Sequence, residues 1–272
     1  MSNFTIASWK NRQALISMNI EEDNWPRRWA LALGHGLATH VDLSYADLTG
    51  AVLTDIDLPG IWLLGADLTG STFDSVTLCD ATLADAILKD TVLEDVDLSN
   101  ANLRGADLHH AALQNVNCTR ADLTSADLTQ ALLSDVNFTH AALIDASLQG
   151  TTFPLTVFTG ALLTGVDLLF APDLPGVPRI PDLDRKILAA LEDGGRLEMD
   201  TWHSCKTTHC RAGWAIHLAG TEGEKLERRY DPALAAALLY TASSPNLPIP
   251  DFFATKEDAL EDMRARAEAG PH

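Results

Sequence analysis

Cysteine, basic side chains and long apolar runs are all scarce in this sequence. Its four cysteines, Cys79, Cys118, Cys205 and Cys210, are too few and too scattered among 272 residues for a disulfide scaffold. No apolar run reaches the roughly 18 residues of a membrane span, and Met1–Arg12 lacks the order of a signal peptide. We therefore expect a cytoplasmic protein with reduced cysteines and no membrane contact.

Lysine and arginine total 19 against 38 acidic residues, which gives a net charge of −19. Because phosphate binding needs clustered basic side chains, this balance excludes a general nucleic-acid binder. The hydrophobic fraction of 46% is too high for a disordered acidic chain. The charge is concentrated in residues 41–170, which hold 18 acidic and 3 basic side chains, so we expect it to lie on a folded, acidic middle segment.

Residues 41–170 form a five-residue repeat of 26 units without a slip in register, from VDLSY to VDLLF. The third position is Leu in 21 units, Phe in four and Cys in one, while the first position is small or β-branched. This period fits neither an α-helix nor a plain strand, and it predicts a short side followed by a turn, with the first and third side chains inward. Larger first-position residues recur every 20 residues, at Ile56, Val76, Val96, Val116 and Val136. Because 20 residues are four units, this recurrence predicts a four-sided coil.

The unit A-(D/N)-L-x-x resembles that of the pentapeptide-repeat family. The resemblance implies an all-β right-handed quadrilateral β-helix, a solenoid built from pentapeptide repeats. At about 4.8 Å per coil, the 26 units would make about 6.5 coils and a prism about 31 Å long.

Four-sided folding sorts the outward side chains into columns. One side presents an acidic column of Asp47, Asp67, Asp107, Asp127 and Asp167. The next side presents an almost uncharged strip of Val52, Thr72, Val92, Ala112, Leu132 and Thr152, with Asp55, Asp95 and Asp135 at its corner. Two interpretations stay open: the carboxylates bind backbone groups at turns, or they form an interaction surface that imitates DNA phosphates, as is thought of family members that protect DNA gyrase.

The flanking segments predict a cap and a helical domain. In residues 1–40 we expect a β-hairpin of strands 4–9 and 14–20, then a capping helix from Asn24 to about Leu37 that covers the first coil with Trp25, Trp29, Leu31 and Leu33. Residues 171–181 form a Pro-rich linker to a C-terminal α-helical domain, 182–272. Its expected helices are 182–193, 208–219, 222–230, 232–243 and 255–268.

The segment TWHSCKTTHCRAGWAIH, residues 201–217, gathers cysteine and histidine and has three interpretations. A zinc site would use His203, Cys205, His209 and Cys210, although no C-x-x-C pair exists. A nucleophilic thiol would place Cys210 in the first turn of a helix, with His203, His209 or His217 as base. We favour the third, a buried cysteine that packs as a small hydrophobe, and so predict no catalytic residue, metal or cofactor.

Nearly the whole chain resembles a group of bacterial and prophage-encoded pentapeptide-repeat proteins that share the strand pair, the repeats and the T-W-H-x-C…T-T-H-C-R-A-G-W segment. This resemblance implies an architecture rather than an activity. We predict a non-enzymatic scaffold or interaction protein with a protein partner, no direct contact with nucleic acid, and a possible homodimer through a terminal domain. The alternatives are a DNA-mimicking inhibitor or protector of DNA gyrase or another DNA-handling protein, and a thiol-dependent enzyme.

Overall fold

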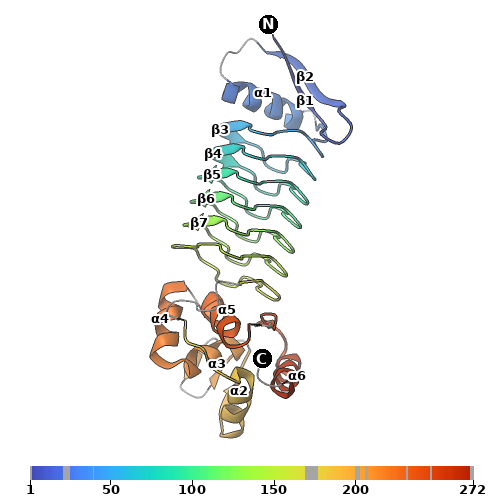
Figure 1. Cartoon of the computed structure of the whole chain (residues 1–272). Coiled ribbons are helices and arrows are strands. Elements are labelled where there is room, and N and C mark those ends of the chain that lie inside the picture. The colour runs from blue at the N-terminus through green and yellow to red at the C-terminus, as the bar shows by residue number, and fades with distance from the viewer. Residues whose placement is uncertain are drawn as a thin grey trace. The chain divides into compact units, whose positions relative to one another are not determined.

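The computed structural model describes residues 2–20, 25–38, 40–168, 177–199, 203–205, 208–230, 232–245 and 247–269. The chain forms two compact units, Met1–Thr156 and Val157–His272, and each is described by itself (Figure 1). The predicted domain boundaries at residues 40, 170 and 181 stay predictions. None of the described helices is long and apolar enough to cross a membrane.

The first unit begins with an antiparallel strand pair, β1 (Ser2–Ala7) and β2 (Ala14–Ile20), followed by helix α1 (Trp25–Ala38). Alternation along β1 buries Phe4 and Ile6, and Phe4 packs edge-on against Trp29 at 5.0 Å between ring centroids. Leu33 is buried as predicted, whereas Leu31 is 47% exposed, so its predicted place over the first coil is wrong. The side chain of Trp25 lies outside the described residues.

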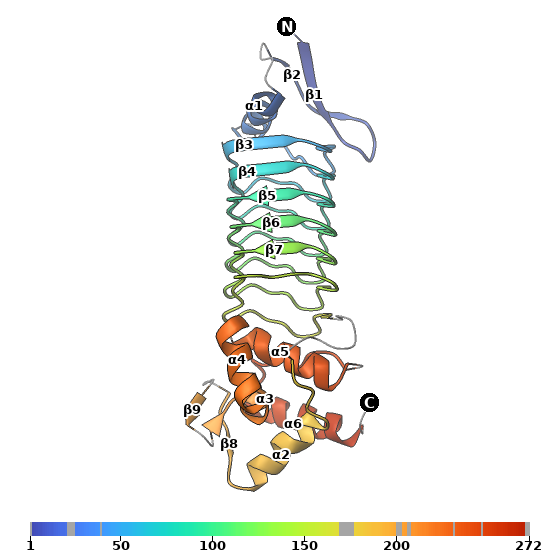
Figure 2. The ribbon, with the colours of Figure 1, turned by 60° about the vertical axis from the view of Figure 1, so that its left-hand side comes forward.

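The repeats of the first unit wind into a four-sided solenoid. Parallel pairs join residues 20 apart in four series, as in Asp47–Asp67, Val52–Thr72, Asp57–Thr77 and Trp62–Thr82. One side is a five-stranded parallel sheet in the order β3 (Val52–Asp57), β4 (Thr72–Thr77), β5 (Val92–Glu94), β6 (Ala112–Gln114) and β7 (Leu132–Ser134), visible as stacked arrows in Figure 2. The predicted β-helix is thereby confirmed, with each pentapeptide forming one side.

The sequence pattern maps directly onto burial and backbone conformation. Third-position side chains such as Leu48 and Leu103 are buried, and so is the first-position column from Val76 to Val136. Fifth-position residues form the corners in the left-handed conformation, for example Gly60 at φ 66° and Asp80 at φ 59°. Gly, Asn and Asp adopt that conformation most readily, which explains why they recur at this position.

The second unit begins with the last repeats, in which Phe158, Leu163 and Leu168 are buried. Its helices are α2 (Leu183–Glu192), α3 (Arg211–Leu218), α4 (Gly220–Tyr230), α5 (Pro232–Ser243) and α6 (Lys256–Glu268). Helix α5 is buried along 233–240, because its residues there are nearly all apolar.

The C-terminal segment differs from its predicted all-helical form in one place. Strands β8 (Arg196–Leu197), β9 (His203–Cys205) and β10 (Thr208–His209) form a small sheet in the order β8-β10-β9. The start of the predicted helix over 208–219 is therefore wrong, because 208–209 pair in this sheet and α3 begins at Arg211. Strands of two or three residues are too short to leave an alternating pattern. Of the predicted linker, residues 171–176 lie outside the described part.

Candidate functional site

Four of the predicted acidic residues form one column on a side of the first unit. Parallel pairing runs in register through the series Asp47, Asp67, Ile87, Asp107, Asp127 and Ser147. The fifth predicted member, Asp167, belongs to the second unit. The structure thus brings four of the five carboxylates together, about 4.8 Å apart along the axis where they occupy successive coils.

Each of these four carboxylates also holds its own turn. One oxygen, Oδ1, accepts a hydrogen bond from the backbone N–H two residues later, at 3.0 Å for Asp67 with Thr69 and 2.9 Å for Asp127 with Thr129. Asp47 and Asp107 do the same, at 3.4 and 3.2 Å. The turn-binding interpretation is therefore seen in the geometry, and it uses only one of the two carboxylate oxygens.

The second oxygen is open to cations. Oδ2 of Asp107 lies 3.1 Å from Lys89 Nζ, and Oδ2 of Asp47 lies 3.8 Å from Arg12 Nη1. The hydrogen bond to Asp107 raises the pKa of Lys89. Within the described part of the chain no such ion pair reaches Asp67 or Asp127, so the column keeps a net negative charge.

The uncharged strip lies on the adjacent side, along β3 to β7. Its residues pair in register, and Val92 and Leu132 are 43% and 56% exposed. Asp55, Asp95 and Asp135 stand at its corner with φ between 51° and 58°, and Asn115 Nδ2 donates to Asp95 Oδ1. The predicted strip and its acidic corner are thus neighbouring columns of one unit, while their role in binding stays a prediction.

In the cysteine and histidine segment, Cys210 is buried. Cys210 is the N-cap of α3 rather than part of its first turn, and its Sγ accepts a hydrogen bond from the Gly213 N–H at 3.3 Å. Burial raises the pKa of the Cys210 thiol, which opposes thiolate formation. His209 instead stacks on His217 at 4.8 Å and meets Trp214 edge-on at 4.9 Å between ring centroids.

The zinc interpretation finds no second pair of ligands in the described side chains. The side chains of His203 and Cys205 lie outside them, so only His209 and Cys210 can be placed. Among the described residues no group of three His, Cys, Asp or Glu could hold a metal ion.

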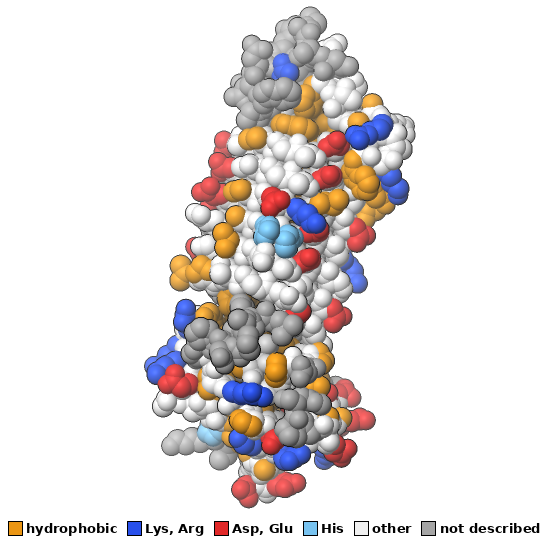
Figure 3. Space-filling view, in the orientation of Figure 1, with side chains coloured by type: hydrophobic (Ala, Val, Ile, Leu, Met, Phe, Trp, Pro, Cys, Tyr) orange, Lys and Arg blue, Asp and Glu red, His pale blue; other side chains and the backbone are white. Residues whose placement is uncertain are grey.

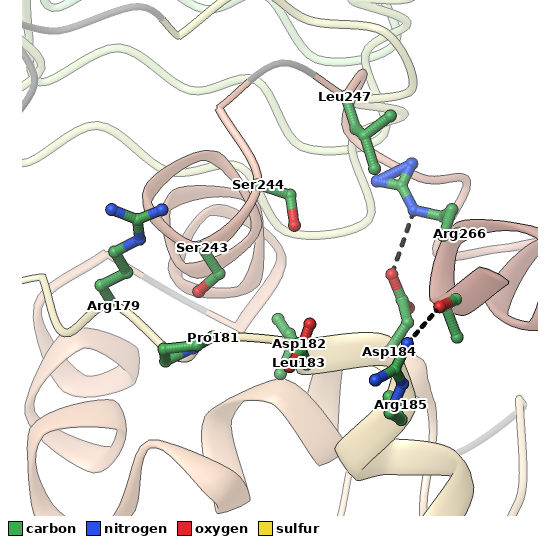
Figure 4. A pocket seen from close by; sticks show the side chains of 11 residues that line it. Arg179, Pro181, Asp182, Leu183, Asp184, Arg185, Ser243, Ser244, Leu247 and Arg266 are labelled. Carbon is green, nitrogen blue, oxygen red and sulfur yellow. Dashed lines mark hydrogen bonds and ion pairs between the residues drawn. The ribbon is translucent and has the colours of Figure 1, made fainter. Parts of the chain in front are cut away.

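A buried ionic network in the second unit was not predicted from the sequence. Arg211 is 1% exposed, and its guanidinium donates to Asp184 at 2.7 Å, to Asp262 at 2.6 Å and to the Tyr240 hydroxyl at 2.9 Å. Arg266 Nε donates to the other Asp184 oxygen at 3.1 Å (Figure 4). Burial raises the pKa of Tyr240, so its hydroxyl stays protonated and donates to Asp184 at 2.9 Å.

This network joins α2, α3, α5 and α6, and its charged groups are already bonded to one another. Arg211 is a single charge directly before the apolar stretch from Ala212 to Ile216, which was the one signal in the sequence. A buried charge needs a partner, but the partner residues lie 27 and 51 positions away. The arrangement ties four helices of the second unit together.

Comparison with known proteins gives one family and several structures. The family model described as "Pentapeptide repeats (8 copies)" matches residues 63–100, 101–139 and 141–171. The chain is similar to a pentapeptide repeat protein from the Arabidopsis thaliana thylakoid lumen, at 34% identity, covering 38% of this chain and 68% of that one with a TM-score of 0.33. It is also similar to HetL of Nostoc, a pentapeptide repeat protein involved in heterocyst differentiation regulation, at 32% identity, with coverage of 46% and 71% and a TM-score of 0.21.

A third similar structure is that of QnrB1, a plasmid-mediated fluoroquinolone resistance protein. It is 19% identical, the match covers 62% of this chain and 73% of that one, and the TM-score is 0.30. Among curated proteins, no sequence matches the chain.

Proposed function

The chain belongs to the pentapeptide-repeat family, and we propose that it is a non-enzymatic interaction protein whose solenoid surface binds a protein partner. The observation that carries the proposal is the pair of neighbouring columns on Met1–Thr156. One presents the Asp47–Asp127 carboxylates, and the other presents the exposed apolar side chains of Val92 and Leu132.

We also propose a cytoplasmic location, which cell fractionation tests. A homodimer through a terminal domain is proposed as well, and light scattering tests it.

The proposal rests on how little freedom these side chains have. The backbone beneath them is held by hydrogen bonds between coils, such as Asp67 N–H to Ala46 O at 2.9 Å, and the carboxylates are held by their turns. A surface that is ordered before binding loses less entropy when a partner docks. The carboxylates would speed encounter with a basic partner, and the apolar strip would supply contact area.

Capture of partners from a lysate tests the proposal. The variant Asp47→Asn, Asp67→Asn, Asp107→Asn, Asp127→Asn removes four charges but keeps an oxygen for each turn, as Asn117 does naturally at 3.2 Å from the Thr119 N–H. We expect the wild type to capture a specific protein and this variant to lose it while unfolding at the same temperature. If the wild type captures nothing, or both proteins capture it equally, the acidic column is not an interaction surface.

Imitation of duplex DNA toward DNA gyrase or another DNA-handling protein is the alternative. It is favoured by the regular repetition of carboxylates at coil spacing, and it is weakened by the ion pairs that Lys89 and Arg12 make with the same column. A supercoiling assay with purified protein separates the two proposals. Neither inhibition nor protection of the enzyme at micromolar protein would remove DNA mimicry and leave the interaction proposal in place.

A thiol-dependent enzyme is the second alternative, and the burial of Cys210 as the N-cap of α3 argues against it. Labelling with iodoacetamide at neutral pH, read out by peptide mass spectrometry, tests it directly. We expect Cys210 to stay unlabelled in the folded protein. Labelling of Cys210 faster than that of an unfolded control would support thiol chemistry instead.

A further inference from the structure

Apolar side chains larger than alanine recur on every second coil of the uncharged strip. Val52, Val92 and Leu132 lie on every second coil, and the coils between them present Thr72 and Ala112. Of the three, Val92 and Leu132 are exposed, at 43% and 56%, while Val52 is half-buried. Val52, Val92 and Leu132 are therefore apolar projections two coils apart, with the hydroxyl of Thr72 and the methyl of Ala112 between them.

The spacing of these projections matches a helix laid along the row. Two coils of a β-helix rise about 9.6 Å, because neighbouring parallel strands are about 4.8 Å apart. Seven residues of an α-helix rise about 10.5 Å. Over the two steps from Val52 to Leu132 the difference accumulates to less than about 2 Å, so apolar residues at i, i+7 and i+14 of a helix can seat between the projections.

The acidic residues along the edge of the strip favour a helix with basic side chains. Asp55, Glu94, Asp95 and Asp135 stand along one edge, and no Lys or Arg in the described part of the chain pairs with them. Figure 3 shows hydrophobic and acidic side chains interspersed along the edge of the molecule where Figure 1 places β3 to β7. Basic side chains along one flank of an apolar stripe complement this arrangement.

We propose that the strip and its acidic corner bind a basic amphipathic helix of a partner protein, with apolar residues at heptad spacing and Lys or Arg on the flank that faces the acidic corner. This proposal rests on the proposed function, because it names the class of partner for the same solenoid surface. A second copy of this chain is a poorer occupant, because the solenoid that would approach carries 18 acidic and 3 basic residues in 41–170.

Fluorescence anisotropy with a synthetic peptide tests the proposal on the full chain. The probe is a labelled 18-residue peptide with Leu at heptad positions a and d and Lys elsewhere, compared with a scrambled peptide of the same composition. The test variant is Val92→Ser, Leu132→Ser. The matched control is Trp62→Ser, which removes a side chain 62% exposed on another side of the solenoid.

We expect the wild type and the Trp62 variant to bind the amphipathic peptide at least tenfold more tightly than the double serine variant does. We also expect at least tenfold preference for the amphipathic over the scrambled peptide. Equal binding by the serine variant, or equal binding of the two peptides, would show charge attraction alone and overturn the proposal. Self-association of the wild type that the serine substitutions abolish would assign the strip to a second copy, and would also overturn it.

The two proposals can fail separately. Suppose that the wild type captures a protein, that the variant with the neutralised acidic column does not, and that the wild type does not bind the peptide. The helix proposal is then wrong, and the interaction function stands. If neither capture nor peptide binding occurs, both are wrong. Because all three substituted side chains are exposed, circular dichroism melts should show the same unfolding temperature for every variant within about 2 °C.

Discussion

At the scale of single residues, the second position of the repeat combines a structural and an electrostatic role. Asp and Asn both accept the turn hydrogen bond there, as Asp127 does from Thr129 and Asn137 does from Thr139. Only Asp adds a charge, so the excess of Asp in the acidic column is not required by the turn. This difference makes the charge separable from the fold by substitution.

Asp67 offers the cleanest test of that separation. Its Oδ1 accepts both the Thr69 N–H at 3.0 Å and the Thr69 hydroxyl at 2.6 Å. We expect Asp67→Asn to leave the free energy of unfolding within about 0.5 kcal/mol of wild type. Asp67→Ala should lower it by about 1 kcal/mol, because the turn loses its acceptor. Urea unfolding of both variants measures the difference, and equal losses would mean that the charge itself stabilises the turn.

Cys118 predicts how stability depends on pH in the alkaline range. Burial raises the pKa of its thiol from 9.0 to about 12. The folded state therefore keeps the proton that the unfolded state releases above pH 9, and the stabilisation present below pH 9 is lost as pH rises toward 12, by up to about 1.4 kcal/mol per pH unit. Compared with Cys118→Ala, wild type should lose stability more steeply between pH 9 and 11. Parallel curves for the two proteins would contradict a buried neutral thiol.

At the scale of elements, the corners and the helix contacts carry different kinds of constraint. A corner needs a residue in the left-handed conformation. Whether that residue can carry a side chain depends on the space that the neighbouring coil leaves. At Gly65 a Cβ would lie 2.6 Å from the Tyr45 ring, and that ring is packed by Trp9, whose Nε1 donates to the Gly65 carbonyl at 2.8 Å. At Gly50 a Cβ would meet nothing within 4 Å.

The pair Gly65→Ala and Gly50→Ala separates the two constraints. Both substitutions force Ala into positive φ, which costs about 1 kcal/mol. Gly65→Ala should cost about 1–3 kcal/mol more, because the Tyr45 ring must move against Trp9. Thermal unfolding compares them. A Gly65→Ala protein as stable as Gly50→Ala would show that the hairpin does not hold Tyr45 in place.

The second unit depends on the buried ionic network around Arg211. Arg211→Met leaves Asp184 buried with one cation fewer, and removing one partner of a buried pair costs about 3–5 kcal/mol. The matched control is Arg228→Ala, which breaks an exposed i,i+4 pair with Glu224 and should cost less than about 0.5 kcal/mol. Differential scanning calorimetry should show the C-terminal transition lowered or lost only in the first variant. An unchanged transition would mean that the network is dispensable.

At the scale of the whole molecule, the two units differ in how much the sequence could predict. Every coil repeats the same local rules, so the five-residue period, with Leu at the third position and small or β-branched residues at the first, was enough to predict the solenoid. The second unit is held by single long-range contacts. Asp184, Tyr240 and Arg266 meet Arg211 or one another across up to 82 positions, and no local pattern marks them as partners.

The same contrast explains why the helix predicted to begin at residue 208 begins only at Arg211. The composition after Thr208 favours a helix, but β10 pairs with β8 and β9 instead. Local helix propensity does not reveal such a long-range pairing. The repeat predicts which side chains point outward, but it does not predict which of them form ion pairs. Which Asp residues are paired with Lys89 or Arg12 depends on side-chain reach between coils and from the hairpin.

We propose that the charge of the acidic column binds a protein partner. The most direct test is the dissociation constant of the captured partner for wild type and for the variant with Asp47, Asp67, Asp107 and Asp127 changed to Asn, measured at two salt concentrations. We predict at least tenfold weaker binding by the variant at low salt, and a smaller difference at high salt. Equal affinity of two equally folded proteins at both salt concentrations would contradict the claim.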